Sequence, residues 1–138
     1  AGFLYGAEAF SLSEVLCIRL RTFYHSCVRA MCSVTKRMVW KKRISTESSE
    51  ALLGMQSIDV YVYRRQLAWV GHVSRMGWER IPRKLLSSWV GATRAQCGVE
   101  MTYGRALQKA FRRAGLDENW HVRAQDRAGW AEMIKGLC

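Results

Sequence analysis

The chain has 138 residues, of which 49% are apolar and 24% are charged, a balance typical of a folded domain rather than a disordered tail. Its 22 Lys and Arg stand against 11 Asp and Glu, which gives a formal net charge of +11. Most of the basic residues are Arg, whose planar guanidinium group pairs with phosphate and stacks on bases. The composition favours a nucleic-acid partner over a small-molecule substrate; the alternative is a solvated basic surface without a ligand.

No apolar stretch reaches about 18 residues, so we expect no membrane span and no membrane partner. The five cysteines are odd in number and form no Cys-x-x-Cys pair, which fits a reducing intracellular compartment, nuclear or cytoplasmic. A zinc site built from His25, Cys27 and Cys32 would need a loop and a fourth ligand, whereas these residues lie in a helical pattern. The sequence begins without Met or a signal peptide, so we expect a fragment of a longer protein.

An apolar stripe with helical spacing runs through residues 12–38. Its members are three or four positions apart, which predicts one long helix that buries this stripe. Ser11 or Ser13 can cap the helix, and we expect it to end near Val39. The stripe consists of Leu12, Leu16, Leu20, Phe23, Cys27, Met31, Val34 and Met38.

The same segment, 1–44 in our division of the chain, is strongly basic. Between Val15 and Thr46 it contains eight Lys or Arg and neither Asp nor Glu. One side of the predicted helix can therefore pack into a core while the other side faces a polyanion. The basic residues are Arg19, Arg21, Arg29, Lys36, Arg37, Lys41, Lys42 and Arg43, with Trp40 among the last of them.

Residues 45–90 predict the central helices. A short helix begins at Ser45 or Thr46 and closes at Gly54. The next runs from Ser57 to about Arg75 and is apolar almost all round, as a buried central helix is. Residues 60–63 could alternatively form a strand.

Two residues in this region have a predicted structural role. Gly71 would let a neighbouring element approach the central helix closely, and Pro82 opens a short helix that reaches Val90. Residues 91–101 show no period and predict an irregular loop.

Residues 102–138 predict the C-terminal helices. The first is capped by Thr102 and ended by Gly115, another section starts at Trp120, and Asp126 caps the last. We therefore expect one all-α domain over 1–138, with five to seven helices around one core.

The sequence offers no set of residues that would form an active site. It contains no Walker loop, no nucleophile elbow and no dinucleotide-binding glycine motif. We expect no catalytic residue, no metal site, no cofactor and no enzyme activity of the chain by itself. Its Asp residues fit helix starts and its His residues are scattered: Asp59, Asp117, Asp126, His25, His72 and His121.

Five phrases follow one another along the chain. Residues 4–10 read Leu-Tyr-Gly-Ala-Glu-Ala-Phe, residues 64–76 read Arg-Arg-Gln-Leu-Ala-Trp-Val-Gly-His-Val-Ser-Arg-Met, and residues 80–86 read Arg-Ile-Pro-Arg-Lys-Leu-Leu. The Leu, Phe, Cys and Arg of residues 20–29, and Trp-x-x-x-Ala-x-Asp-Arg-x-x-Trp at 120–130, complete the series. In order and spacing these phrases resemble the C-terminal part of the reverse transcriptase of non-LTR retrotransposons.

The resemblance implies a thumb and post-thumb region, a helical thumb-like bundle that holds the template–primer duplex or the element RNA. The catalytic Asp pair of such RNA-directed DNA polymerases belongs to the palm, and this sequence has no match to it. The palm and fingers of the parent polymerase would be its protein partner. A domesticated or decayed helical RNA- or DNA-binding module without a polymerase partner is the alternative.

We expect sequence-independent phosphate contacts from the long basic helix. Trp40 would pack on a sugar or base, or else plug the end of the helix. Arg64, Arg65 and Arg75 would brace helices through acids such as Glu47, Glu50 or Glu79. The predicted contacts are Arg21, Arg29, Lys36, Arg37, Lys41, Lys42 and Arg43, with Arg105, Lys109, Arg112 and Arg113 as a second patch or a solvated face.

Overall fold

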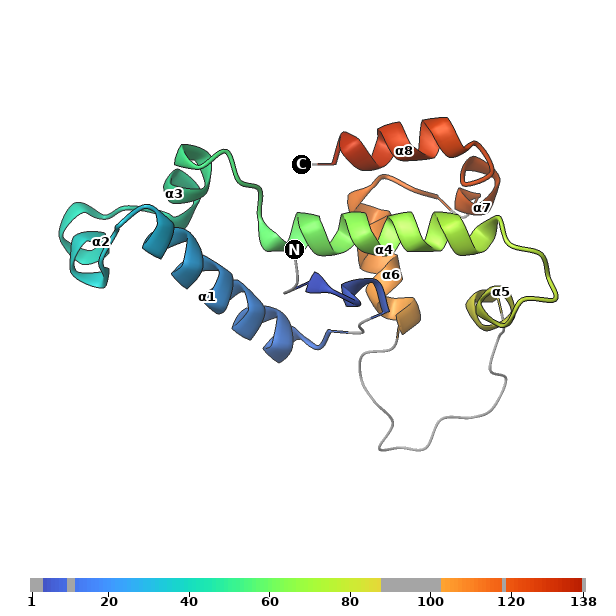
Figure 1. Cartoon of the computed structure of the whole chain (residues 1–138), viewed down its shortest axis with the longest axis horizontal. Helices are drawn as coiled ribbons and strands as arrows, with labels where there is room; N and C mark the ends of the chain where they lie inside the picture. The colour runs from blue at the N-terminus through green and yellow to red at the C-terminus, as the bar shows by residue number, and fades with distance from the viewer. Residues whose placement is uncertain (1–3, 10–11, 88–102, 118, 138) are drawn as a thin grey trace. The chain divides into compact units, whose positions relative to one another are not determined.

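The computed structural model describes residues 4–9, 12–87, 103–117 and 119–137, and only the backbone of Ser87, Arg105 and Ala106. These residues form a 3-10 turn and eight α-helices and include no strand (Figure 1). The predicted all-α class is confirmed, and residues 60–63 are helical. The loop predicted at 91–101 and the cap predicted at Thr102 lie outside the described residues. The elements are η2 (Ala7–Ala9), α1 (Glu14–Met31), α2 (Lys36–Lys42), α3 (Thr46–Leu52), α4 (Ile58–Ser74), α5 (Ile81–Ser87), α6 (Tyr103–Arg113), α7 (Trp120–Arg123) and α8 (Arg127–Lys135).

Backbone contacts group the described residues into two units. Unit 1 takes those of 1–11 and 62–137, and unit 2 consists of residues 12–61. The boundary falls inside α4, between Tyr61 and Val62. Whether the chain folds as one domain stays a prediction.

The prediction of one helix over residues 12–39 is wrong, because the chain turns between α1 and α2. The Val34 amide donates to the Arg29 carbonyl at 2.9 Å and the Ser33 amide to the Ala30 carbonyl at 3.0 Å, which closes α1 with a Schellman motif. Ser33 adopts a left-handed φ of 55°. The hydroxyl of Thr35 then accepts from the Met38 amide at 3.3 Å and starts α2. This break accounts for one helix more than the predicted maximum of seven.

The prediction that the helix buries the apolar stripe is also wrong for α1. Leu16, Phe23 and Met31 are 47%, 51% and 60% exposed, whereas Tyr24 and Val28 are buried. The face of α1 that packs within unit 2 carries residues 21, 24, 25, 28 and 32, and four of these contact residues 49–59 through polar groups. The pairs are Arg21–Asp59, Tyr24–Gln56, His25–Glu50 and Cys32–Ser49. The packed face of α1 thus combines buried Tyr24 and Val28 with polar contacts to a distant segment, and it is not the widest apolar stripe.

Most predicted caps are confirmed. The hydroxyl of Ser13 accepts from the Leu16 amide and starts α1, and that of Ser45 accepts from the Ser48 amide and starts α3. Asp126 accepts from the Ala128 amide and starts α8. Gly54 and Gly115, with φ of 61° and 62°, end α3 and α6.

In unit 1, α8 lies antiparallel along α4 (Figure 1). The core contains Leu67, Ala110, Ala124 and Trp130, all buried. The indole Nε1 of Trp130 donates to the Leu67 carbonyl at 3.0 Å, and its ring covers the backbone of Gly71. The close approach predicted at Gly71 is thereby confirmed.

Arginines brace these helices, although not through the predicted acids. Arg64 Nη2 donates to the carbonyls of Lys135, at 2.8 Å, and Leu137, at the C-terminal end of α8. Arg75 Nη1 donates to the carbonyl of Ala124, which ends α7. Arg65 pairs with Glu8 at 3.2 Å. Guanidinium groups thus satisfy carbonyls that helix ends leave open.

Candidate nucleic-acid interface

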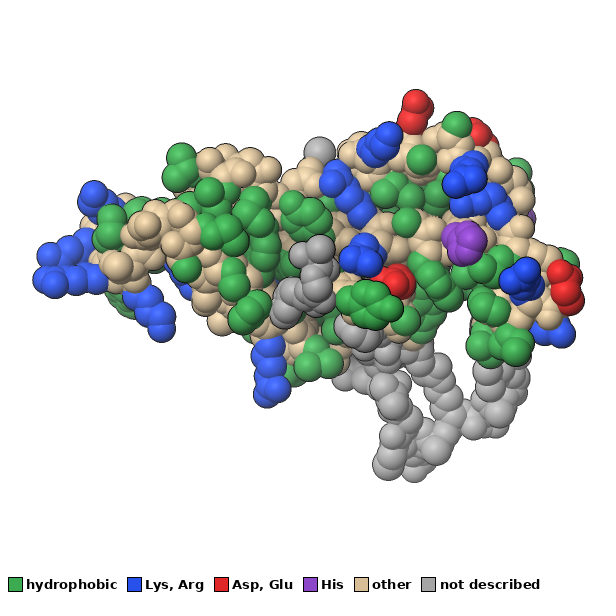
Figure 2. Space-filling view, in the orientation of Figure 1, with side chains coloured by type: hydrophobic (Ala, Val, Ile, Leu, Met, Phe, Trp, Pro, Cys, Tyr) green, Lys and Arg blue, Asp and Glu red, His purple; other side chains and the backbone are tan. Residues whose placement is uncertain are grey.

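The largest set of predicted contacts lies on and just after α2. We call Lys36, Arg37, Trp40, Lys41, Lys42 and Arg43 the α2 basic cluster. All six side chains are exposed, and Trp40 is 86% exposed, which is incompatible with its predicted alternative role as a plug at the helix end. Figure 2 shows Lys and Arg gathered over α2, and on the face drawn no acidic side chain of the described residues lies among them.

The geometry of α2 places four members of the cluster together. Successive residues turn by about 100° in an α-helix, so Lys36, Trp40, Arg37 and Lys41 fall, in that order, within an arc of about 140°. Met38 and Val39 fall outside this arc and are half-buried. Arg43 ends the helix with a left-handed φ of 49°. A short, capped helix therefore presents an aromatic ring between cations.

Among the residues that the structure describes, no acid pairs with the cations of the cluster. Ion pairs among the described residues join Arg21 to Asp59 at 2.7 Å and Arg65 to Glu8 at 3.2 Å, and Nε2 of His25 lies 3.6 Å from Oε1 of Glu50. The cations of the cluster are left to solvent and counterions.

Two of these charges cost local stability, whereas Lys41 and Lys42 lie in the last turn of α2, where the helix dipole favours cations. Lys36 and Arg37 occupy the first turn of α2, where the helix dipole favours negative charge, and each costs about 0.3–1 kcal/mol there. Arg37 and Lys41 are like charges four residues apart, which adds a few tenths of a kcal/mol. A bound anion would relieve both effects.

The other predicted contacts on α1 have partners within the protein. Arg21 Nε donates to Asp59, so a phosphate would compete with this ion pair. Arg29 is half-buried, and its Nη2 donates to the Ser26 hydroxyl at 3.4 Å. Their phosphate contacts stay predictions.

The second predicted patch lies on α6 in unit 1. The helix buries Leu107 and Ala110 and exposes Lys109, Arg112 and Arg113, so its basic face points outward. The side chain of Arg105 lies outside the described residues. Whether this face binds a ligand also stays a prediction.

Two tyrosines anchor their units with hydroxyls that keep their protons. Burial, followed by the negative charges of Tyr61 and Glu50, raises the pKa of Tyr24 to about 12. Burial, followed by Glu8, raises the pKa of Tyr103 far above its usual range. Tyr24 donates to the Gln56 carbonyl at 2.6 Å, and Tyr103 to the Glu8 carbonyl at 3.0 Å. Both hydroxyls therefore hold segments of their own unit together.

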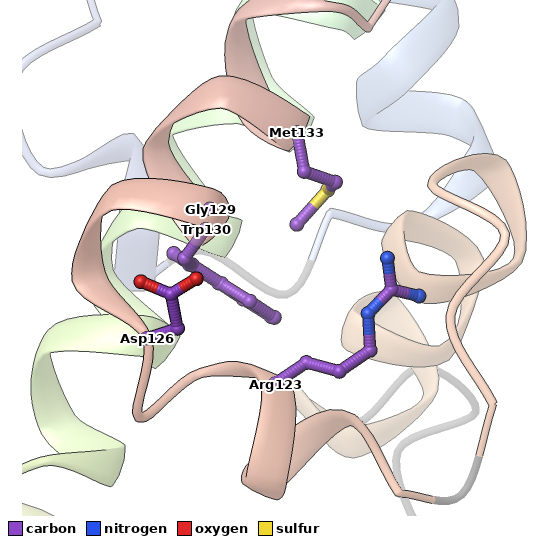
Figure 3. Close-up of a pocket in the computed structure, with 5 residues that line it drawn as sticks. All are labelled: Arg123, Asp126, Gly129, Trp130 and Met133. Carbon is purple, nitrogen blue, oxygen red and sulfur yellow. The ribbon is translucent and has the colours of Figure 1, made fainter.

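A hollow of about 190 Å³ opens between α7 and α8 (Figure 3). Arg123 stands on one side and Asp126 on the other, with Trp130 and Met133 between them. Asp126 already caps α8, and the indole N–H of Trp130 already donates to Leu67. The local fold therefore accounts for the polar groups of Asp126 and Trp130.

Further surface features bear on the chemistry of the chain. Trp78 is 64% exposed, and the guanidinium of Arg83 lies 5.1 Å from the centre of its ring; sequence reasoning singled out neither residue for the interface.

No helix in the described ranges is long and apolar enough to cross a bilayer. Across the same residues, no three His, Cys, Asp or Glu gather as a metal site would need.

Comparison with known proteins finds a similarity to one described as transposon-derived. The chain is 20% identical over 146 aligned residues to a Caenorhabditis elegans protein described as uncharacterized and transposon-derived. The alignment covers 95% of this chain and 49% of that protein, so the chain spans about half the length of its relative. No protein-family model and no solved structure matches the chain.

Proposed function

We propose that this chain is the nucleic-acid-binding C-terminal region of a reverse transcriptase encoded by a non-LTR retrotransposon. The α2 basic cluster would bind phosphates of the template–primer duplex or of the element RNA, and the palm and fingers of the parent polymerase would be its protein partner. The chain itself would contribute no catalytic residue.

One observation carries this proposal: five exposed cations share a short helical segment where no described carboxylate pairs with them. All five are exposed, and Lys36 and Arg37 stand in the first turn, where the helix dipole disfavours cations, so an anionic ligand explains the cluster better than packing does. The similarity to a transposon-derived protein and the five sequence phrases support a retroelement origin.

The test compares two variants with the same net charge. In the cluster variant, Lys36, Arg37, Lys41, Lys42 and Arg43 become Gln. In the control variant, five exposed cations elsewhere become Gln: Arg80, Lys84, Arg123, Arg127 and Lys135. Binding of each full chain to a labelled RNA–DNA hybrid is measured by fluorescence anisotropy between about 50 and 200 mM salt.

Five phosphate contacts give a slope of about −4 in a plot of log affinity against log salt. We expect this slope for the wild-type chain, a much flatter slope for the cluster variant, and a slope near wild type for the control. Equal slopes for the two variants would show that overall charge, rather than the α2 basic cluster, governs binding. A wild-type slope near zero would remove the electrostatic premise.

A further inference from the structure

We propose that the α2 basic cluster takes a single-stranded segment of RNA or DNA, with Trp40 stacked on an unpaired base and the neighbouring cations on the flanking phosphates. This inference rests on the proposed function and specifies the form of nucleic acid that the cluster accepts.

Trp40 differs from the other tryptophans that the structure describes. Trp69 meets Tyr103 edge to face at 5.6 Å, Trp120 stacks on Phe111 at 5.0 Å, and Trp130 is buried against Gly71. Trp78 has Arg83 over its ring. Among the described residues, no aromatic ring stacks on Trp40, no cation lies over its ring, and no group forms a hydrogen bond with it. A large aromatic surface is thus left in water, where it gains nothing from packing.

The position of Trp40 on α2 suits a base with phosphates on both sides. Lys36 lies one turn before it on the same side of the helix, and Arg37 and Lys41 lie in the adjoining part of the arc. A base on the indole ring would bring the phosphates before and after it toward these cations. Alternating aromatic and cationic contacts are how proteins hold single strands without reading their sequence.

A duplex cannot use the ring in this way. Its interior bases are already stacked on both faces and expose only their edges in the grooves. Cations alone would bind the phosphates of the duplex, and an exposed Trp would add little to the affinity. The open π surface therefore favours an unpaired segment over a continuous helix.

An anionic membrane is the other surface that attracts cations beside a Trp. Interfacial helices, however, carry a wide apolar face opposite their charges. On α2 the other large apolar side chains, Met38 and Val39, are half-buried within the protein, and only Trp40 stands free. The cluster lacks the apolar area that such binding needs.

The experiment uses the full chain with a labelled 12-nucleotide oligo-U, the matching 12-base-pair RNA–DNA hybrid, and vesicles of phosphatidylserine and phosphatidylcholine. Trp40→Ala removes the ring, Trp40→Phe keeps a smaller one, and Trp78→Ala is the control at another exposed Trp. Circular dichroism checks folding, since exchange of an exposed side chain should leave stability nearly unchanged.

We expect Trp40→Ala to weaken oligo-U binding roughly 5- to 150-fold, the range for loss of one base–aromatic stack. Trp40→Phe should retain most of the affinity, hybrid binding should change less than about twofold, and Trp78→Ala should bind both probes as the wild type does. This pattern would support the inference.

Three results would overturn it. An equal loss on oligo-U and hybrid, or equal losses for Trp40→Ala and Trp40→Phe, would end the stacking argument while leaving the proposed function standing. Tighter, Trp40-dependent binding to the vesicles would assign the cluster to a membrane. If the wild type bound neither nucleic acid, both this inference and the proposed function would fail.

Discussion

Replacement of Gly71 by Ala tests how α8 packs on α4. A Cβ atom built on Gly71 would lie 2.6 Å from Cδ1 and 2.9 Å from Cε2 of the Trp130 indole, well inside van der Waals contact. Trp130 is only 4% exposed and donates to the Leu67 carbonyl, so its ring can move away from Gly71 only by giving up this hydrogen bond. The substitution must therefore displace α8 or turn the ring out of its site.

The magnitude follows from three terms. Overpacking of this kind costs about 1–3 kcal/mol, and loss of the indole hydrogen bond about 0.5–1.5 kcal/mol. Ala is a better helix former than Gly by about 1 kcal/mol, which offsets part of this cost. We expect Gly71→Ala to lower the free energy of unfolding by roughly 2 kcal/mol.

The assay is urea unfolding followed by circular dichroism, with Gly104→Ala as the matched control. Gly104 also lies in a helix, but a Cβ there would meet no atom within 4 Å, so this variant should be as stable as the wild type or more stable by up to about 1 kcal/mol. In a Trp130→Leu background the cost of Gly71→Ala should shrink, because the clashing ring is gone. If Gly71→Ala proved as stable as Gly104→Ala, the described packing of Trp130 on α4 would be wrong.

Two further predictions concern unit 2. Ser33→Gly should raise the free energy of unfolding by about 0.5–1 kcal/mol, because Ser33 holds a left-handed φ of 55°. Ser26→Gly inside α1 should instead lower the free energy of unfolding by about 0.5 kcal/mol. If both variants were less stable in urea than the wild type, the Schellman turn would be contradicted. The folded-state pKa of Tyr24 is raised to about 12 from an ordinary value near 10. The stabilisation that the Tyr24 hydroxyl gives to the folded state is therefore complete below pH 10 and is lost as the pH rises toward 12. The stability gap between wild type and Tyr24→Phe should therefore narrow over this interval, and a constant gap would show that the hydroxyl is not buried as described.

Local signals in the sequence were enough to place most helix ends. Ser13, Ser45, Asp126, Gly54 and Gly115 act within four residues of themselves, through side-chain hydrogen bonds or a left-handed φ. The turn between α1 and α2 had a local signal too, the Thr35 hydroxyl three residues before the Met38 amide. The unbroken apolar stripe concealed it, since a stripe can continue in register across a short break.

Burial on α1 could not be predicted from periodicity. The stripe of Leu, Phe and Met is the widest apolar face of the segment, yet the packed face holds Arg21, Tyr24 and His25. The partners of this face lie 17 to 38 residues away in sequence. A helical period reports the direction of side chains around one axis and carries no information on such distant partners.

Where described acidic residues form pairs, their partners lie outside the α2 basic cluster, so the cluster differs from the paired basic residues of the chain. Glu8 pairs with Arg65 and Asp59 with Arg21, while Asp126 caps α8. Since residues 16–45 include no acid, only acids from elsewhere could neutralise the cluster, and none of the described ones does so. In the proposed function, counterions near the cluster would be released when it binds phosphate, and this release would supply affinity. Introducing a carboxylate near the cluster, for example by Val34→Glu beside the start of α2, should accordingly weaken nucleic-acid binding more than the same charge change on α8.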